Sequence, residues 1–515
     1  MAEKYDVVVV GAGNAGLSAA VSCAAQGKKT LLIEKHNLPG GVASSFKRGR
    51  FEFDPSVHEI CDYGADNDKG HVRLIMEKNG VKIDWITVPD CYRAISTYSD
   101  GTPMDVTIPC GREAYIAAVE SYVPGSRESL EKFFDLIEEI RAAKVYMFDG
   151  TPNDSKYMQK HFPNTLRTCG YDALTVMKAL KMPQKAIDIV GVYWPYLGVP
   201  LDEVNFFHFG NMIDMYVTRR AVIPHHTSHE ISMTFMNRFY ELGGEAWFNC
   251  RAEEFLFDGD RVCGVRTNLG DVACKQVLAS INPNIIYANM MPKHLVPERE
   301  KKLAAARRGK FSTKFCMIYF ALNKTCEELG LTDYCVFFAG SADSRREYNN
   351  IKSIDNDYNI LISYNNLIPD FSPEGTCVIS FTKLFSSAED WGKIAPEDYY
   401  RVKDRMIAKC IDDLQKKLGI DITPYIEEVE VATPMTFARY LGTPDGTPYG
   451  FEVSEWDGVL ARMMDIEADF NVKGLRHIGA GSFFGDGYSS TWINGDMTAG
   501  LACAELDKGG EQSWR

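Results

Sequence analysis

The first 34 residues alternate between apolar runs and a stretch of small residues. Residues 7–10 are four consecutive valines, and an alanine-rich stretch follows as far as Ala25. A second apolar run, Thr30–Ile33, comes next and precedes Glu34. This succession predicts a strand, a helix and a second strand, which together form a βαβ unit with parallel strands.

From Asp62 to Asp214 the pattern is mostly helical. Residues 127–146 predict an amphipathic helix because apolar side chains recur at i, i+3, i+4 and i+7. That apolar stripe consists of Leu130, Phe133, Phe134, Ile137 and Ile140. Residues 172–189 also predict helix, divided at Pro183, because proline lacks the backbone N–H that a helix interior needs.

Beyond Ile223 the pattern becomes mixed. Helices are expected at residues 232–242, which Gly243 and Gly244 end, and at 396–418 and 497–506. Short runs of β-forming residues predict strands at 245–249, 253–257, 262–266, 277–280, 314–322, 334–338, 359–364 and 377–382. The last four of these predict an antiparallel sheet.

The chain is long enough, at 515 residues, for two or three domains. The pattern predicts an α/β fold with a discontinuous, Rossmann-like dinucleotide-binding domain made of residues 1–61, 215–300 and 430–515. Residues 62–214 and 301–429 are expected to form an inserted substrate domain of helices and antiparallel sheet.

The turn inside the βαβ unit has the pattern Gly-x-Gly-x-x-Gly, at Gly11, Gly13 and Gly16. In dinucleotide-binding units these glycines permit the tight turn, the approach of a pyrophosphate and the close packing of helix on strand. Glu34 follows at the position where a carboxylate accepts hydrogen bonds from a ribose. The glycine motif, the two predicted strands and Glu34 follow one another at the spacing of a dinucleotide-binding unit. This favours a bound dinucleotide over a glycine-rich turn in another kind of βαβ unit.

Composition narrows the range of partners. A net charge of −14 argues against nucleic-acid binding, which needs clustered Lys and Arg. No run of about 20 apolar residues predicts a membrane span, although peripheral membrane contact stays open. The 14 cysteines include no Cys-x-x-Cys pair. With residues 1–4 leading straight into the first strand instead of a signal peptide, the cysteine pattern favours a cytoplasmic protein with reduced thiols.

Three later segments add family-specific patterns. Residues 38–46 read Leu-Pro-Gly-Gly-Val-Ala-Ser-Ser-Phe, residues 49–58 contain Phe-Asp and end in His58, and residues 474–500 are rich in glycine. They resemble the motifs of the phytoene desaturase, carotenoid isomerase and retinol saturase group, within the flavin amine oxidase superfamily. The resemblance covers most of the chain. One departure is Val42, where the superfamily usually has arginine.

The resemblance implies FAD as the cofactor. The residues expected to bind it are Gly11, Gly13, Asn14, Ala15, Gly16, Glu34, Lys35, Gly40, Gly41, Val42, Ser44, Ser45, Gly479, Gly481, Asp486, Gly487, Tyr488, Trp492 and Asp496. No second nucleotide-binding βαβ unit for NAD(P)H is evident in the sequence. Electrons are therefore expected to come from the substrate or from an external electron donor or acceptor.

Candidate catalytic residues are His58, Tyr488 and His225. His58 follows the second flavin motif and Tyr488 lies in the C-terminal one, although ordinary packing would explain either residue equally. His225, with His226 and His229, lies where phytoene desaturases have a Gly-Gly pair. These histidines lack an obvious Cys or carboxylate partner, so no metal site is predicted. The aromatic residues 193–196 could line an apolar tunnel.

The leading hypothesis is an FAD-dependent oxidoreductase acting on the C=C bonds of a hydrophobic, unsaturated substrate such as an isoprenoid, polyene or lipid. Reduction and desaturation come first, with redox-neutral isomerisation close behind. The alternatives are a flavin amine oxidase, which Val42 disfavours, and a non-enzymatic prenyl- or lipid-binding escort protein of the same fold. The sequence leaves the oligomeric state unknown.

Overall fold

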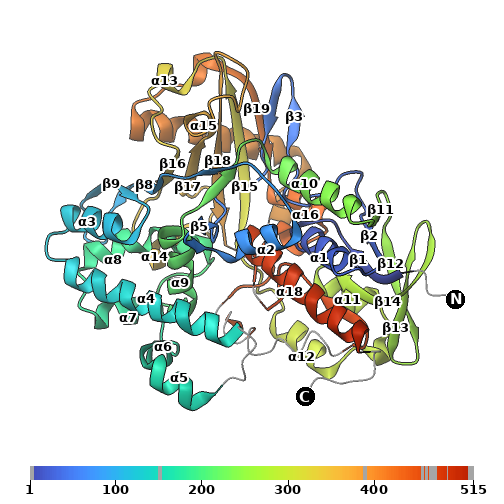
Figure 1. Cartoon of the computed structure of the whole chain (residues 1–515). Coiled ribbons are helices and arrows are strands. Elements are labelled where there is room, and N and C mark those ends of the chain that lie inside the picture. The colour runs from blue at the N-terminus through green and yellow to red at the C-terminus, as the bar shows by residue number, and fades with distance from the viewer. Residues whose placement is uncertain are drawn as a thin grey trace.

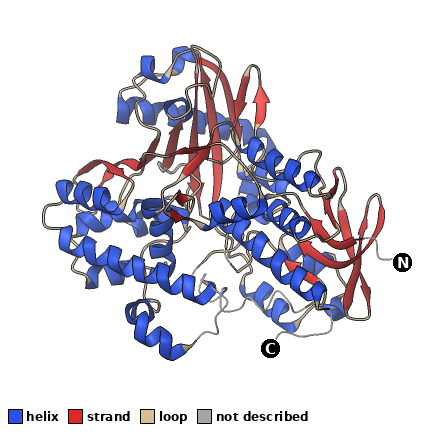
Figure 2. Ribbon diagram, viewed as in Figure 1, coloured by secondary structure: helices blue, strands red, loops and turns tan. Residues whose placement is uncertain are grey.

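The structure is a computed structural model that describes residues 5–148, 154–386, 391–453, 457–458, 462, 472–483 and 485–508. Residues 1–4, which bear on the signal-peptide prediction, lie outside the described residues. Two large sheets and a set of helices make up the described chain (Figures 1 and 2). The predicted α/β fold with a Rossmann-like unit and an antiparallel sheet is confirmed.

The first sheet has seven strands in the order β11-β2-β1-β14-β13-β12, with β20 beside β14. Strands β11, β2, β1, β14 and β20 pair in parallel, whereas β12, β13 and β14 form an antiparallel meander. The strands are β1 (Tyr5–Val10), β2 (Thr30–Ile33), β11 (Glu245–Trp247), β12 (Ala252–Asp258), β13 (Arg261–Thr267), β14 (Gly270–Ala279) and β20 (Leu475–His477). All of them fall on predicted strands or beside the C-terminal glycines.

Three helices pack together beside this sheet: α1 (Asn14–Ala25), α10 (Ser228–Glu241) and α18 (Tyr488–Asp507). The hydroxyl of Ser18 on α1 donates to the carbonyl of Trp492 on α18, at 2.8 Å. Helix α18 begins at Tyr488, nine residues before the predicted start at residue 497. The prediction was wrong there because Gly495 interrupts the apolar pattern. In the structure this glycine lets α18 pack on α1, since a Cβ there would lie 2.3 Å from the carbonyl oxygen of Ala15.

The second sheet also has seven strands, in the order β19-β15-β18-β17-β16-β8-β9. Only the β16–β8 pair is parallel. The strands are β8 (Asp90–Thr97), β9 (Pro103–Pro109), β15 (Lys314–Leu322), β16 (Cys335–Phe338), β17 (Asn359–Ser363), β18 (Cys377–Phe385) and β19 (Ile426–Ala432). Strands β15 to β18 confirm the predicted antiparallel sheet.

Strand β15 is buried along its whole length because both faces of the second sheet are covered. Ile318 and Phe320 pack in the cluster that includes apolar residues of α15 (Tyr399–Leu418), on the outer face. Met317 and Tyr319 belong to the cluster that includes the helical segment. This explains why β15 is almost continuously apolar instead of alternating.

The helical segment contains α3 to α9 and one short 3-10 turn, on the left of Figure 1. Its elements are α3 (Arg112–Tyr122), α4 (Arg127–Phe148), α5 (Ser155–His161), α6 (Pro163–Thr168), α7 (Ala173–Ala179), α8 (Gln184–Val190), η1 (Gly191–Tyr196) and α9 (Phe206–Ile213). The predicted helix at 127–146 and the division at Pro183 are confirmed. Residues 90–109 are not helical, because β8 and β9 extend the second sheet there.

Shorter elements connect these parts. They are β3 (Phe46–Arg48), β4 (Phe51–Phe53), β5 (Gly64–Ala65), β6 (Asp68–Lys69), α2 (His71–Asn79), β7 (Trp85–Thr87), η2 (Asp214–Thr218), β10 (Val222–Pro224), α11 (Pro283–Asn289), α12 (Glu298–Ala306), α13 (Cys326–Leu329), α14 (Ser344–Asn350) and α16 (Pro434–Leu441). Strands β7 and β10 pair with each other, which ties the segment before α10 to the segment after α2.

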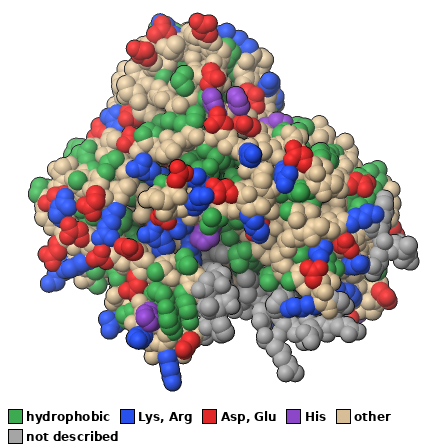
Figure 3. All heavy atoms as spheres, viewed as in Figure 1, with side chains coloured by type: hydrophobic (Ala, Val, Ile, Leu, Met, Phe, Trp, Pro, Cys, Tyr) green, Lys and Arg blue, Asp and Glu red, His purple; other side chains and the backbone are tan. Residues whose placement is uncertain are grey.

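The surface is mixed in charge. Acidic and basic side chains are interspersed over the face drawn in Figure 3. Among the described residues, no helix combines the length and the apolar character that crossing a membrane requires. All 14 cysteines lie within the described residues and none of them is in a disulfide.

We expect Phe133→Ala to lower the free energy of unfolding by about 3–5 kcal/mol, because Phe133 is fully buried between α4 and its neighbours. The matched control on the same helix is Val145→Ala, whose side chain is exposed and whose change should be below about 0.5 kcal/mol. Urea denaturation followed by circular dichroism measures both. Equal effects of the two variants would contradict the packing described.

Candidate functional site

One cavity of about 590 Å³ reaches from the βαβ turn to the helical segment. Fourteen of the predicted site residues line it: Gly11, Gly13, Asn14, Ala15, Glu34, Lys35, Gly40, Gly41, Val42, His58, Gly479, Asp486, Gly487 and Tyr488. Gly16, Ser44, Ser45, Gly481, Trp492, Asp496 and His225 are not part of its lining. The chain therefore brings its N-terminal and C-terminal motifs together around a single space.

The glycines of the first turn have distinct steric surroundings. At Gly11 the φ angle is +94° and a Cβ would lie 2.9 Å from the carbonyl oxygen of Ser280. At Gly16 a Cβ would lie 1.8 Å from the carbonyl oxygen of Gly11, so only glycine allows α1 to start so close to β1. A Cβ at Gly13 would meet nothing within 4 Å, because Gly13 faces the cavity.

Polar groups at this end of the cavity fit a dinucleotide. The Glu34 carboxylate accepts from the backbone N–H of Ala12 at 2.6 Å and of His36 at 2.9 Å, and lines the cavity. The side-chain oxygen of Asn14, at the first turn of α1, is buried and has no hydrogen-bond partner. The open glycine at the helix N-terminus leaves room for a pyrophosphate, whose oxygens would accept from the backbone N–H groups there. The Asn14 oxygen would instead need a donor, such as a hydroxyl group of the cofactor.

The second flavin motif packs directly on the first. Gly13 and Gly40 form an isolated β-bridge, and a Cβ at Gly41 would lie 3.3 Å from the Cα of Gly13. The hydroxyl of Ser44 donates to the carbonyl of Pro39, at 2.9 Å. The hydroxyl of Ser45 donates to the Glu52 carboxylate. Both serines therefore stabilise the loop instead of facing the cavity.

The C-terminal motif ends at the N-terminus of α18. Gly487, the residue before the helix, has φ +90° and open space where a Cβ would be. Upstream, the backbone N–H of Gly479 donates to the side chain of Asn494 at 2.8 Å, which fixes the glycine turn on the helix. Two helix N-termini, of α1 and α18, thus border one cavity. Gly481 packs beside Phe451 instead.

Two residues of the C-terminal motif lie away from the cavity. Trp492 is fully buried and stacks on Phe235, with ring centroids 5.9 Å apart. The Asp496 carboxylate accepts from Lys78 at 3.0 Å and from Asn79 at 3.1 Å, both on α2. These two side chains join α18 to α10 and α2, and the structure does not bring them to the proposed cofactor.

His225 is also remote from the cavity. Its ring lies between Asp84, at 3.0 Å, and Asp370, at 3.2 Å, near the surface. These carboxylates raise the pKa of His225. His226 stacks on it, with centroids 5.0 Å apart. Among the described residues, no group of three or more His, Cys, Asp or Glu side chains is arranged to hold a metal ion.

His58, the other histidine predicted as catalytic, lies beside the flavin motifs and is joined by hydrogen bonds to two further polar residues. Nε2 of His58 lies 2.9 Å from the Tyr196 hydroxyl, which lies 3.3 Å from Oε2 of Glu59. All three residues line the cavity, and the second carboxylate oxygen of Glu59 is buried without a hydrogen-bond partner. Burial raises the pKa of Glu59 well above its usual value and lowers the pKa of His58 to about 4.

Sequence reasoning missed Glu59, although it follows His58 directly in an apolar context. A buried Asp, Asp54, was also missed. Its carboxylate accepts from the backbone N–H groups of Val57 at 2.7 Å, Ser56 at 3.0 Å and Ser228 at 2.7 Å. Asp54 therefore anchors the loop that presents His58 and Glu59, and the first turn of α10.

Two candidates from the C-terminal motif complete the lining. The Tyr488 hydroxyl lies 3.0 Å from the Ser56 hydroxyl, and burial raises the pKa of this tyrosine well above its usual value. Burial also raises the pKa of Asp486, to about 7. Tyr488 is therefore neutral near pH 7, whereas Asp486 titrates close to that pH.

Comparisons with known proteins agree with this arrangement. Residues 6–56 match the family model described as FAD dependent oxidoreductase. Among solved structures, an oxidoreductase from Methanosarcina mazei superimposes with a TM-score of 0.61 at 12% identity, over 96% of this chain and 100% of that one. Cyclohexylamine oxidase from Brevibacterium oxydans superimposes with a TM-score of 0.61 at 13% identity, over 98% of this chain and 99% of that one. The fold and the cofactor motifs define an FAD-dependent oxidoreductase.

Curated relatives indicate which FAD-dependent oxidoreductases this chain is similar to. The all-trans-retinol 13,14-reductase of Rattus norvegicus is 23% identical over 483 residues, 87% of this chain and 77% of the relative. The chloroplastic prolycopene isomerase of Daucus carota is 23% identical over 98% of this chain and 80% of the relative. The predicted resemblance to retinol saturases and carotenoid isomerases is confirmed, and so is FAD as the cofactor.

We expect Gly13→Ala to leave the apoprotein as stable as wild type, because the new methyl group meets no atom and Gly13 has φ −74°. FAD affinity should fall at least ~10-fold, since the methyl group would occupy the space of the pyrophosphate. Thermal unfolding of apoprotein and fluorescence titration with FAD measure the two effects. Gly500→Ala, in open space on α18, is the matched control. Unchanged FAD affinity would place the pyrophosphate elsewhere.

Proposed function

We propose that the protein is an FAD-dependent oxidoreductase that reduces a C=C bond of a hydrophobic, unsaturated substrate, with Glu59 as the source of the proton. The observation that supports this most directly is the buried polar chain His58–Tyr196–Glu59, which lines the cavity beside the flavin motifs. The relatives named as a retinol reductase and a prolycopene isomerase support the choice of an unsaturated isoprenoid-like substrate.

Saturation of a C=C bond adds a hydride to one carbon and a proton to the next. Reduced FAD, when bound, would supply the hydride. The proton must come from a side chain that is protonated at working pH and lies in the cavity. Glu59 is suited to this role, because burial favours its protonated form and it lines the cavity.

The hydrogen bonds of the chain are consistent with a protonated Glu59. Nδ1 of His58 lies 3.3 Å from the carbonyl oxygen of Ser56, which can only accept, so we assign the imidazole hydrogen to Nδ1. Nε2 of His58 then accepts from the Tyr196 hydroxyl. Because that hydroxyl has a single hydrogen, the contact between Tyr196 and Glu59 needs a hydrogen on Glu59.

Apolar and aromatic side chains surround the hydrogen-bonded residues His58, Tyr196 and Glu59 and provide a dry pocket. Tyr193, Tyr216 and Phe337 pack around Tyr196, with ring centroids 5.1 to 5.9 Å away. Tyr216 and Leu197 also line the cavity. Such a lining excludes water from the reacting carbons and matches an isoprenoid, polyene or lipid chain.

We further propose that the protein is cytoplasmic and relies on an external electron donor. The absence of disulfides among its cysteines supports a reducing compartment. The described residues contain one βαβ nucleotide unit, at β1–α1–β2, which supports a donor other than a resident nicotinamide. A net charge of −14 supports the expectation that nucleic acid is not a partner.

The decisive experiment mixes chemically reduced holoenzyme anaerobically with all-trans-retinol and with other polyenes and unsaturated lipids. Reoxidation of the flavin with a saturated product supports the proposal. Isomerised product without flavin oxidation would indicate an isomerase, and bleaching of oxidised enzyme would indicate a desaturase. Hydrogen peroxide formed from an amine panel would indicate an amine oxidase. Purified protein without FAD would indicate an escort protein.

We expect Glu59→Gln to retain FAD and to slow flavin reoxidation by the substrate about 10²- to 10⁴-fold, the usual contribution of a general acid. Stopped-flow absorbance of pre-reduced enzyme measures this rate. Glu77→Gln is the control, because Glu77 pairs with Lys69 and Arg73 on the surface. A Glu59→Gln rate within a few-fold of wild type would remove Glu59 from the reaction.

The same rate should depend on pH. Below the raised pKa of Glu59 the carboxyl is protonated, so the rate of flavin reoxidation is constant. As the pH rises through the raised pKa of Glu59 the carboxyl ionises, the acid is lost and the rate falls. We expect this falling limb in wild type and its absence from Glu59→Gln. A rate that rises with pH instead would indicate a base, and therefore desaturation.

A further inference from the structure

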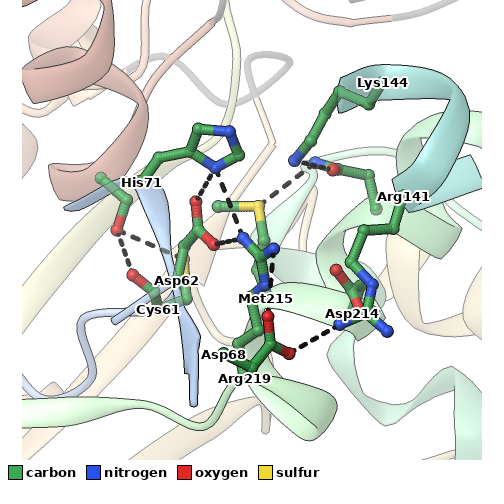
Figure 4. A network of polar contacts seen from close by, with 11 residues as sticks. Cys61, Asp62, Asp68, His71, Arg141, Lys144, Asp214, Met215 and Arg219 are labelled. Atoms are coloured by element: carbon green, nitrogen blue, oxygen red, sulfur yellow. Dashed lines mark hydrogen bonds and ion pairs between the residues drawn. The ribbon is translucent and has the colours of Figure 1, made fainter. Parts of the chain in front are cut away.

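A cluster of charged groups adjoins the cavity at the helical segment (Figure 4). Its members come from the loop before α2, from α2 itself, and from α4, α9 and η2. We call it the Lys144 cluster; its members are Asp62, Asp68, His71, Arg141, Lys144, Asn211, Asp214, Met215 and Arg219. The proposed reduction uses none of these residues.

Lys144 is the cation of this cluster that faces the cavity. Its side chain is 8% exposed and lines the cavity together with Asn211 and Met215. The ammonium donates one hydrogen bond, to the neutral side-chain oxygen of Asn211 at 2.7 Å. An ammonium has three N–H donors. Among the described residues, none of the carboxylates forms an ion pair with Lys144 within 4.0 Å.

The neighbouring carboxylates are bound elsewhere or neutralised. Asp62 accepts from Arg219 at 2.7 Å and lies 2.9 Å from His71. Burial would raise the pKa of Asp62, but the hydrogen bond from His71 and the nearby cations lower it, so Asp62 stays charged. Asp214 has neither oxygen hydrogen-bonded, and its nearest cation is Arg141 at 3.7 Å.

Burial raises the pKa of Asp214, which favours its neutral form. Arg219 bonds to Asp62, and Arg141 bonds to Asp68 at 2.9 Å. Asp62 therefore acts on Lys144 only through space, and no carboxylate among the described residues lies within ion-pairing distance of the ammonium. A buried ammonium with N–H donors to spare is stabilised by an anionic ligand.

The amide of Asn211 can also turn to a ligand. Its nitrogen donates to the sulfur of Met215, at 3.2 Å, and a thioether is a weak acceptor. The lining of the same cavity also includes Phe207, Met212 and Tyr216, and the Asp62 carboxylate that Arg219 and His71 bind. Apolar side chains and the Lys144 ammonium therefore line one space.

We propose that Lys144 and Asn211 bind the carboxylate of an unsaturated carboxylic acid, so that the preferred substrates are polyene or unsaturated fatty acids and not neutral polyenes. This inference rests on the proposed function and names its substrate class. One ammonium neutralises one carboxylate, whereas a phosphate is usually held by several cations or by a bidentate arginine. The acid's hydrocarbon chain would then lie beside Glu59.

The test compares ligands that differ only in the polar end. Oxidised holoenzyme is titrated with all-trans-retinoic acid, methyl retinoate and all-trans-retinol, and with linoleic acid and linoleyl alcohol, following the flavin absorbance. In wild type each acid should bind about 10- to 100-fold more tightly than its alcohol or ester, as expected for a hydrogen bond to a buried charged group. Lys144→Met should abolish this difference and leave alcohol affinity within about two-fold of wild type.

Lys132→Met is the matched control, because Lys132 lies on the same helix α4 but pairs with Glu128 on the surface. Asn211→Asp is a second variant, which places a carboxylate against Lys144 and should also abolish the preference for acids. FAD content and melting temperature identify any variant that fails to fold. The affinities of the wild-type protein for acids, alcohols and esters test the carboxylate site even without the variants.

Equal binding of acid and alcohol by wild type would overturn the inference, and so would a preference for acids that survives Lys144→Met. If retinol or linoleyl alcohol reoxidises the reduced enzyme while acids show no advantage, the proposed function stands and the carboxylate site fails. If neither acids nor alcohols perturb the flavin or reoxidise it, both are overturned.

Discussion

A buried carboxylate, that of Asp54, holds together the parts of the molecule on which catalysis would depend. It accepts three backbone hydrogen bonds, two from its own loop and one from the start of α10. Because Asp54 is 1% exposed, removing it would leave several buried N–H groups without acceptors, at a cost of about 1–3 kcal/mol for each. The loop that presents His58 and Glu59 is thereby fixed to the cofactor-binding half of the protein.

The same loop contacts the second sheet. The Tyr334 hydroxyl donates to the carbonyl of His58, and the Tyr364 hydroxyl donates to the carbonyl of Val57 at 3.0 Å. Both tyrosines come from the β16–β17 region. One short segment, residues 54–59, therefore contacts both the cofactor-binding elements and the second sheet. It sets the distance between the hydrogen-bonded residues His58, Tyr196 and Glu59 and the flavin motifs.

The sequence allowed two buried strands to be predicted to the residue. Thr30–Ile33 and Lys314–Leu322 were expected with the bounds that the structure has, because a strand buried on both faces is continuously apolar. Strand β9 was missed, although Met104, Val106 and Ile108 alternate with exposed residues. Its period of two is short and is interrupted by proline at both ends, so a helical reading of the wider window prevailed.

At the site, glycines and Glu34 could be recognised because their roles follow from local backbone geometry. The reaction end could be predicted only in part. His58 and the aromatic residues 193–196 were singled out, whereas Glu59 and Lys144 were not, because these residues come to line one cavity only through tertiary packing between segments far apart in sequence. Their residue types are unremarkable in isolation. His225 illustrates the converse: a conspicuous cluster of histidines proves to be part of an ion pair near the surface.

The contact of Ser18 with Trp492 joins residues that are 474 positions apart. The second helix N-terminus beside the cavity is therefore made only after every residue from Ser18 to Tyr488 has been synthesised. Domains tend to fold from the N-terminus as they leave the ribosome. Here the β1–α1 unit is synthesised long before α18, so the face of α1 that α18 covers stays exposed in the meantime. A cofactor site that is bordered by both helix N-termini can form only after α18 has been added.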